Sequence, residues 1–244
     1  MNEFIYKSRQ ENILIEYICS SKLTTKEILN DIKEFYNNNP YHNFLHALQV
    51  SSNVLLLSLD DFSILELRTL LYAGLFHDAM HKGKLNVLDE FISYSIAYDY
   101  LNKNIDKVWE IDFIILRKAI IWTVFKNRGK YTDKYSILLW DLDILSIWID
   151  IYTQIYYWDI LCFEFWIPIE KWVNDFSFYK NTLKISKKIF LSPYILKSFP
   201  NSINVIWERL KISKDVLISM LKVLRDEDIT LAEFRERFKN IIVK

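Results

Sequence analysis

The scarcity of glycine and proline constrains the fold of this chain more than any other feature. Only 3 glycines and 4 prolines occur in 244 residues, whereas 51% of the residues are hydrophobic and 16% are aromatic. Sheets joined by tight turns usually need more of both, because glycine and proline supply the special backbone angles of turns. The composition therefore predicts an all-α protein with ample material for a hydrophobic core.

Helix start signals recur along the chain. A capping-box pattern, with Ser or Thr followed three residues later by Glu, occurs at Thr24–Glu27, Ser63–Glu66 and Thr230–Glu233. Asn39 before Pro40 predicts another start, with the proline at the first helical position. We expect helices at about 3–19, 25–37, 40–59, 64–78, 87–102, 107–126, 133–147, 149–166, 168–190, 202–224 and 231–242.

The charges of the chain balance. Lys+Arg and Asp+Glu number 31 each, so no global field attracts nucleic acid or an anionic membrane, and we expect neither duplex nucleic acid nor a membrane as a partner. Cys19 and Cys162 have no metal-ligand or redox spacing and fit buried thiols of a reducing compartment. No signal peptide is recognised, and the most apolar stretch, about 137–169, contains several carboxylates. These features predict a soluble, cytoplasmic protein and leave its oligomeric state open.

All 4 histidines fall into two short windows. His42 pairs with His46 and His77 with His81, each at the i, i+4 spacing that puts both imidazoles on one face of a helix. Asp78 directly follows His77 at the end of a predicted apolar helix. A carboxylate buried there needs a cation or hydrogen bonds to offset the cost of removing it from water. Imidazole and carboxylate groups are ligands of divalent metals, so this concentration predicts a metal site.

A second source of carboxylate ligands lies in a later apolar segment. Asp141 and Asp143 are two residues apart, so they cannot both face one point if the segment is helical. We expect one of them to complete the site, and the spacing alone leaves open which one.

The order of these motifs resembles the HD superfamily of metal-dependent phosphohydrolases. Residues 39–47 (NPYHNFLHA) resemble the first metal-site motif of cyclic nucleotide phosphodiesterases, and residues 76–83 (FHDAMHKG) resemble the second, with Lys82 where a proline normally stands. Residues 89–93 (DEFIS) and 141–146 (DLDILS) are similar to motifs of a bacterial family of predicted HD phosphohydrolases. The resemblance covers about residues 36–190. It implies an HD-domain helical bundle in a single domain, 1–244, with additional N-terminal helices and a C-terminal helical extension at about 191–244.

The resemblance also implies residue roles. By position, the first metal would be held by His46, His77, Asp78 and Asp143, with Asp78 bridging to a second ion where one is present. His81 matches a histidine that orders water at the second metal, and His42 matches the one that donates a proton to the leaving oxygen. The cofactor would be one or two divalent ions, with Mn, Mg, Zn, Fe and Co all suited to such ligands.

Further residues have two interpretations each. Glu90 either orients His42 or a metal-bound water, or is an ordinary acid at a helix N-terminus. Tyr41 and Asn43 lie within the first motif and are candidate substrate contacts. The basic residues Lys82, Lys84 and Arg128 either contact phosphate or are solvated loop residues. The aromatic-rich segment 148–172 either stacks a nucleobase or fills the core.

These features together predict a metal-dependent phosphohydrolase that acts on a small nucleotide-like phosphoester. A cyclic nucleotide or cyclic oligonucleotide, cleaved by attack of metal-bound hydroxide, is favoured because His42 and His81 are both present. Two alternatives remain open. One is a phosphohydrolase of nucleotide mono- or triphosphates, and the other is a non-catalytic, metal-stabilised module that binds nucleotides or proteins.

Overall fold

The protein is all-α in the part that the structure describes. This computed structural model describes residues 2–57, 60–83, 88–123, 133–145, 150–174, 192–200 and 212–242, and every regular element within those ranges is a helix, as predicted. The helices are α1 (Asn2–Ser20), α2 (Lys26–Lys33), α3 (Phe44–Val54), α4 (Ile64–Phe76), α5 (Asp89–Lys103), α6 (Ile105–Val108), α7 (Phe113–Ile121), α8 (Lys134–Leu145), α9 (Ile151–Glu164), α11 (Pro193–Ser198), α13 (Lys214–Asp226) and α14 (Leu231–Ile242).

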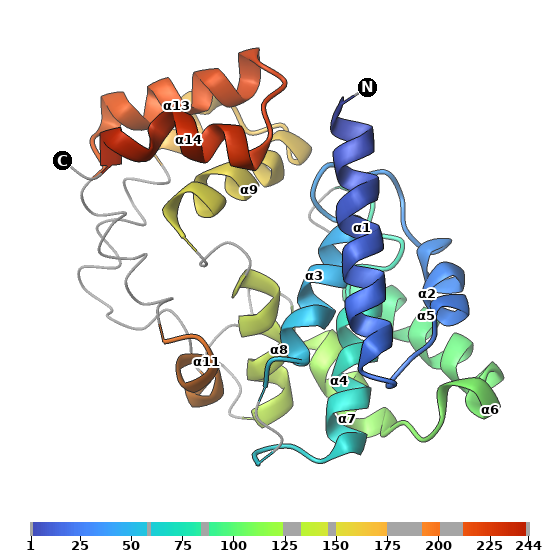
Figure 1. The fold of residues 1–244 in the computed structure, drawn as a ribbon. Helices are drawn as coiled ribbons and strands as arrows, with labels where there is room; N and C mark the ends of the chain where they lie inside the picture. The colour runs from blue at the N-terminus through green and yellow to red at the C-terminus, as the bar shows by residue number, and fades with distance from the viewer. Residues whose placement is uncertain are drawn as a thin grey trace.

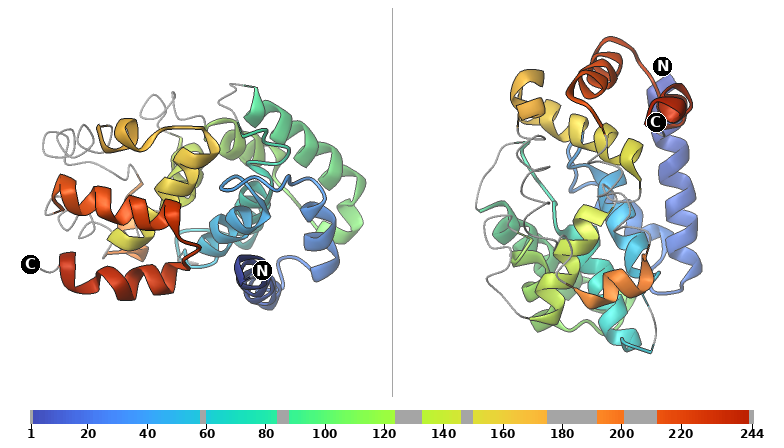
Figure 2. Two further views of the ribbon diagram at one scale, coloured as in Figure 1. Left: turned by 90° about the horizontal axis from the view of Figure 1, so that it is seen from above. Right: turned by 90° about the vertical axis from the view of Figure 1, so that its left-hand side faces the viewer.

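The helices form two groups (Figure 1). In the larger group α3 packs against α1 and α4, while α7 packs against α4, α5 and α8. In the smaller group α13 and α14 pack on α9, and Figure 2 shows this pair at the opposite end of the molecule from α5. Buried apolar side chains from both groups belong to one cluster, which extends from Ile15 to Phe238.

A close approach of α3 to α4 sets the centre of the larger group. A Cβ atom added to Gly74 would lie 2.8 Å from the Ser51 hydroxyl oxygen, so only glycine fits at this crossing without displacement. The Ser51 hydroxyl donates a hydrogen bond of 3.1 Å to the carbonyl oxygen of Leu71. This tight crossing brings the end of α4 close to the first turns of α3.

Two arginines anchor the smaller group to α9. The guanidinium of Arg225, on α13, donates to both carboxylate oxygens of the buried Asp159 at 2.8 and 2.9 Å. Arg235, on α14, pairs with Asp150, which caps the first turn of α9. The Arg225 contact reaches both oxygens of Asp159 and so fixes orientation as well as distance, while Arg235 holds the capping residue at the start of α9.

The predicted start of α3 is wrong. The helix begins at Phe44 with Asn43 as its cap, whose side-chain oxygen accepts a hydrogen bond of 3.2 Å from the backbone N–H of His46. The Asn43 amide nitrogen donates to the carbonyl oxygens of Asn39 and Pro40. Because these bonds hold the preceding residues in a bend, Pro40 does not occupy the first helical position, and His42 lies before the helix rather than within it.

Other boundaries also differ from those expected. The helix predicted over 107–126 is divided into α6 and α7, because Trp109 has a positive φ of 59°. The first cap is Thr25 rather than Thr24, since its hydroxyl accepts from the N–H of Ile28. The capping box at Ser63 is confirmed, and Thr230 and Glu233 exchange the expected hydrogen bonds. Of the helices predicted at 168–190 and 202–224, residues 175–191 and 201–211 lie outside the described ranges.

No helix in the described ranges combines the length and apolar character needed to cross a bilayer.

Candidate metal centre

His77 is oriented as a metal ligand would be. It directly follows α4, and its Nδ1 donates a hydrogen bond of 2.8 Å to the carbonyl oxygen of Gly74. This bond requires the proton on Nδ1, so in the neutral ring, the form that binds a metal, Nε2 carries the lone pair. Nε2 is buried and has no hydrogen-bond partner within the described ranges, although it lies 3.0 Å from an oxygen of Asp78 and 3.5 Å from one of Asp143. A buried nitrogen so placed fits a cation between these groups.

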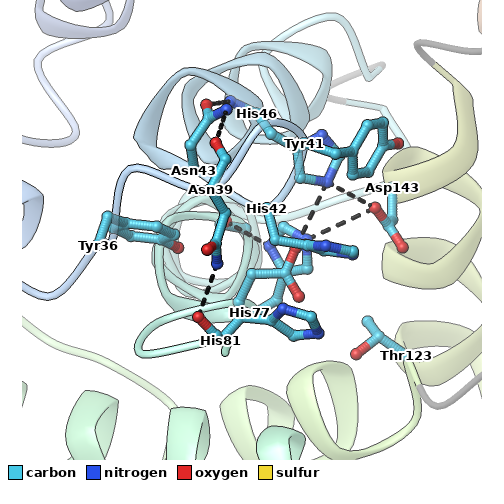
Figure 3. Close-up of polar contacts among 12 residues, drawn as sticks. Tyr36, Asn39, Tyr41, His42, Asn43, His46, His77, His81, Thr123 and Asp143 are labelled. Carbon is cyan, nitrogen blue, oxygen red and sulfur yellow. Dashed lines mark hydrogen bonds and ion pairs between the residues drawn. The ribbon is translucent and has the colours of Figure 1, made fainter. Parts of the chain in front are cut away.

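His46 and Asp143 complete this cluster from two other helices (Figure 3). Nε2 of His46, on α3, lies 2.9 Å from Oδ1 of Asp143, on α8, and 3.6 Å from Oδ2 of Asp78. One donor atom from each of His46, His77 and Asp143 lies within 4.8 Å of the others. Two imidazole nitrogens and a carboxylate oxygen, with Asp78 beside them, are ligands that suit a divalent transition metal.

The electrostatics of the cluster fit the same chemistry. Burial alone would raise the pKa of Asp143, but the interactions with His46 and His77 lower it to about 2. Burial also opposes ionisation of Asp78, yet the neighbouring His77 and His42 hold its pKa well below the ordinary value. Both carboxylates are therefore ionised near neutral pH, which is the state that binds metal.

A second cluster lies beside the first and centres on Glu164, the last residue of α9. Its Oε2 accepts hydrogen bonds from the backbone N–H groups of Tyr41 and His42 at 2.7 and 3.0 Å, and its Oε1 lies 2.5 Å from Nδ1 of His42. The sequence interpretation missed this role. An acid within the apolar and aromatic segment 151–169 was the available signal, because a buried carboxylate there needs partners.

His81 belongs to this second cluster. Its ring stacks on that of His42 with 3.9 Å between the centroids. Its Nδ1 accepts a hydrogen bond of 3.1 Å from the N–H of Gly83, so Nε2 carries the proton and lies 3.7 Å from an oxygen of Asp89. Gly83 makes this turn with a positive φ of 66°, a conformation that glycine adopts readily. His81 therefore lies outside the group formed by His46, His77 and Asp143.

Backbone contacts hold the two histidine motifs together. The side-chain amides of Asn37 and Asn39 both donate to the carbonyl oxygen of His81, at 3.0 and 2.7 Å. The N–H of Met80 donates to the carbonyl oxygen of Phe35 at 2.8 Å. The segment before α3 and the turn after α4 are thereby fixed as one unit, which places His42 over the metal centre.

Two titratable groups near the centre have raised pKa values, each for a different reason. Burial lowers the pKa of His42, but Asp78 and Glu164 outweigh it, so the net pKa is raised from its ordinary value. Burial raises the pKa of the half-buried Glu90 to about 7, and the charges of Asp78 and Asp89 contribute in the same direction. His42 thus retains a proton more readily than a free imidazole, and Glu90 can exchange one near neutral pH.

The structure separates the two candidate aspartates. Asp141 is fully buried, and its Oδ2 accepts a hydrogen bond of 2.7 Å from the backbone N–H of Ser192, so it faces away from His46 and His77. Asp143 alone joins the cluster. The geometry therefore favours Asp143 as the distal ligand.

The candidate substrate contacts have different surroundings. The Tyr41 ring is buried, with its centroid 4.5 Å from that of His46, whereas the side chain of Asn43 is occupied by the cap of α3. Lys82 is exposed on the turn that follows His81. Lys84 and Arg128 lie outside the described residues.

Two further residues contribute to the surroundings of the centre. The side chain of Thr123 faces the same space in Figure 3, and no sequence signal pointed to it. Of the aromatic segment predicted to stack a base or fill the core, Phe165 lies against the site, with its ring centroid 5.6 Å from that of His42.

Comparison with curated proteins finds short regions of similarity. No protein-family model matches the chain. It is 33% identical to a "cGMP-specific 3',5'-cyclic phosphodiesterase gamma" of Plasmodium yoelii over 36% of this chain, and 36% identical to a "probable 3',5'-cyclic-AMP phosphodiesterase" of Caenorhabditis elegans over 32%. It is also 31% identical to a "cGMP-specific 3',5'-cGMP phosphodiesterase 3" of Dictyostelium discoideum over 39%. The chain spans only 12%, 12% and 22% of the length of these relatives, respectively.

Solved structures match over most of the chain. A crystal structure of the phosphodiesterase domain of the Salpingoeca rosetta rhodopsin phosphodiesterase matches 87% of this chain and 82% of its own, with a TM-score of 0.52 and 16% identity. A second structure of that domain matches 97% and 93%, with a TM-score of 0.53 and 14% identity. The chain has the fold of a phosphodiesterase domain. The helical bundle expected from the sequence is therefore confirmed.

Proposed function

We propose that the protein is a metal-dependent phosphodiesterase that hydrolyses a cyclic nucleotide. The observation that carries the proposal is the convergence of His46, His77 and Asp143 directly beside the His42–Glu164 pair. Such a convergence unites a metal-binding group with a proton donor, the two parts that phosphodiester hydrolysis needs. The local similarity to cyclic nucleotide phosphodiesterases agrees with it.

A bound divalent ion would polarise a water molecule and neutralise charge on the phosphate. We assign the ion to His46, His77 and Asp143, with Asp78 at its edge. The ionised carboxylates and the Nε2 lone pair of His77 preorganise these ligands, so that little rearrangement is needed on loading.

His42 is the group suited to protonate the leaving oxygen. Its Nδ1–H donates to Glu164, so a second proton on the ring resides on Nε2, on the opposite side of the imidazole. The ring centroids of His42 and His46 are 6.2 Å apart, so the proton donor lies directly beside a proposed metal ligand. Glu164 then acts as a positioning residue that fixes the ring and stabilises its charge.

The charge of the site favours a substrate with one phosphate. Of the basic residues predicted to contact phosphate, Lys82 lies within the described ranges, and it is exposed. A triphosphate carries several negative charges and usually needs cationic groups that converge on it. A cyclic phosphodiester carries one, which the metal centre itself can neutralise.

A turnover assay tests this proposal. Purified protein loaded with Mn²⁺ or Mg²⁺ is offered cyclic mononucleotides, cyclic dinucleotides, nucleoside mono- and triphosphates, and bis-p-nitrophenyl phosphate. We expect hydrolysis of a cyclic nucleotide, abolished together with metal binding by Asp78→Ala. The matched control is Asp99→Ala, which removes an exposed carboxylate of α5 and should leave both intact. Metal binding without turnover of any diester would overturn the proposal, and turnover of triphosphates alone would favour the alternative phosphohydrolase.

A further inference from the structure

The second cluster brings together three side chains that can each bind a metal ion. One donor atom from each of His42, His81 and Glu164 lies within 4.8 Å of the others. Nδ1 of His42 lies 2.5 Å from Oε1 of Glu164, and Nδ1 of His81 lies 3.7 Å from the same oxygen. This group shares no residue with the group formed by His46, His77 and Asp143, so an ion bound here would be separate from the metal centre.

The distances within the cluster are close to those around zinc. Two ligands of a tetrahedral zinc ion, each about 2.0–2.1 Å from it, lie about 3.3 Å apart. The two distances to Oε1 of Glu164, 2.5 and 3.7 Å, fall on either side of that value. The rings of His42 and His81 are stacked, with 3.9 Å between their centroids and 26° between their planes. Small movements of the side chains would therefore bring all three donors into the range that zinc requires.

The surroundings of His81 direct a lone pair into the cluster. Its Nε2 carries the proton and lies 3.7 Å from an oxygen of Asp89, and a carboxylate behind the imidazole is the arrangement that orients histidine ligands of zinc. Burial lowers the pKa of His81, so its ring is neutral near neutral pH, which is the form that binds metal. An ion at Nδ1 would replace the 3.1 Å hydrogen bond from the N–H of Gly83.

Glu164 offers one oxygen to an ion while the other is held in place. Its Oε2 accepts the backbone N–H groups of Tyr41 and His42, which fixes the carboxylate and leaves Oε1 for the cluster. The Glu164 side chain is buried, so its charge would attract a cation strongly. His42 is half-buried, so an ion can enter from its side, and the proton on its Nδ1 would leave to solvent.

We propose that His42, His81 and Glu164 bind a Zn²⁺ ion that inhibits the enzyme. Two imidazole nitrogens and one carboxylate oxygen are a ligand set that suits Zn²⁺, whereas Mg²⁺ and Mn²⁺ prefer more oxygen ligands. The ion takes the place of the Nδ1 proton, so His42 can no longer form the imidazolium that protonates a leaving oxygen. The binding site follows from the geometry alone, whereas its inhibitory effect rests on the proposed function.

Calorimetry with Zn²⁺ tests the binding site. The full-length double variant His77→Ala/Asp143→Asn lacks two ligands of the metal centre, and we expect it to lose Mn²⁺ binding but to bind one Zn²⁺ ion. Adding His81→Ala or Glu164→Gln should weaken Zn²⁺ binding at least tenfold, because each removes one of three ligands. Helical circular dichroism verifies that the variants fold.

The matched control for the binding test is Glu34→Gln. It makes the same chemical change at an exposed carboxylate that ends α2, and it should leave Zn²⁺ binding unchanged. Absence of Zn²⁺ binding by the folded double variant at millimolar concentration, or binding that neither His81→Ala nor Glu164→Gln weakens, would overturn the inference.

Turnover by the Mn²⁺-loaded chain tests the inhibition. Added Zn²⁺ should slow hydrolysis of a cyclic nucleotide, whose leaving oxygen needs the acid, and should affect bis-p-nitrophenyl phosphate little. His81→Ala should need at least tenfold more Zn²⁺ for the same fractional inhibition. Exchange of Mn²⁺ for Zn²⁺ at the metal centre would instead change both substrates and would not depend on His81. Equal inhibition of both substrates, or inhibition unchanged in His81→Ala, would overturn the inhibitory role.

The two proposals can fail separately. A protein that binds Zn²⁺ at this cluster yet hydrolyses no diester would overturn the proposed function and leave the zinc site standing. A protein that hydrolyses a cyclic nucleotide but whose folded double variant binds no Zn²⁺ would overturn the zinc site and support the proposed function.

Discussion

Replacement of Glu164 by glutamine isolates the proton-donor pair from the rest of the site. A glutamine has nearly the same size, and its carbonyl oxygen can still accept the N–H groups of Tyr41 and His42 that Oε2 accepts now. Its amide nitrogen then faces Nδ1 of His42 and can only donate, so the ring loses the partner for its Nδ1 proton. The substitution thus removes the support for a charged imidazole and leaves the backbone contacts in place.

The magnitude follows from the bond that is lost. A hydrogen bond to a charged group contributes about 1.5–3 kcal/mol, and 1.36 kcal/mol corresponds to about one pKa unit. Because the Glu164 side chain is only 2% exposed, solvent screening reduces this little. We expect the pKa of His42, now raised above its ordinary value, to fall in Glu164→Gln, because one of the carboxylates that raise it is gone.

The direction in which pH changes kcat follows from the requirement for protonated His42. Hydrolysis that needs protonated His42 is lost as the pH rises through the pKa of that residue, so Glu164→Gln should lose kcat at a lower pH than the unmodified enzyme. The pair also stabilises the fold between the lowered pKa of Glu164 and the raised pKa of His42, and the variant should be least stable relative to the parent within that window.

The assay is a pH–rate profile with two kinds of substrate. A cyclic nucleotide has a poor leaving group that needs the acid, whereas bis-p-nitrophenyl phosphate has a good one and should be little affected. Glu66→Gln, which changes a carboxylate at the cap of α4, is the control for the same chemical substitution elsewhere. An unshifted profile, or equal loss on both substrates, would refute the assignment of Glu164 as the positioning residue.

Two further predictions concern the metal centre. Asp143→Asn should weaken metal binding at least tenfold, because it removes a charged ligand, and calorimetry measures the change. Asp141→Asn keeps an acceptor for the backbone N–H of Ser192 and should retain metal affinity. If Asp141→Asn weakened metal binding and Asp143→Asn did not, the two roles would have to be exchanged. Gly74→Ala should reduce stability by about 1–3 kcal/mol and also lower metal affinity, because its methyl group would push the Ser51 side of α3 away from His77. Urea unfolding and metal titration measure the two effects, and a fully stable variant would show that the crossing is not tight.

The predictable part of the site is the part that is local in sequence. The pairs His42–His46 and His77–His81 stand within single windows, and Asp78 adjoins one of them, so spacing alone indicated their chemistry. Asp143 required motif order, since its neighbour Asp141 has the same chemistry and differs only in the direction that α8 gives it.

The unpredicted part depends on tertiary contacts. Glu164 lies 122 residues from His42, and only the packing of α9 brings them together. The start of α3 was misplaced because Asn43 competes with Asn39 as a cap, and hydrogen bonds to Asn39 and Pro40 decide between them. Helix type was predictable from composition, whereas the choice between nearby caps and the break at Trp109 are decided by contacts that a single sequence does not display.

The arginines that anchor α9 connect the C-terminal helices to the proton donor, because α9 carries the Glu164 that holds His42. A fragment ending after α8 would keep His46, His77 and Asp143 and would still carry the motifs of a metal protein. It would lack Glu164, and the imidazole of His42 would lose the partner of its Nδ1 proton and one of the carboxylates that raise its pKa. A protein that lost these helices would keep metal binding and lose hydrolysis. Loss of the last helices is therefore a direct evolutionary route from an enzyme to a metal-binding protein without catalysis.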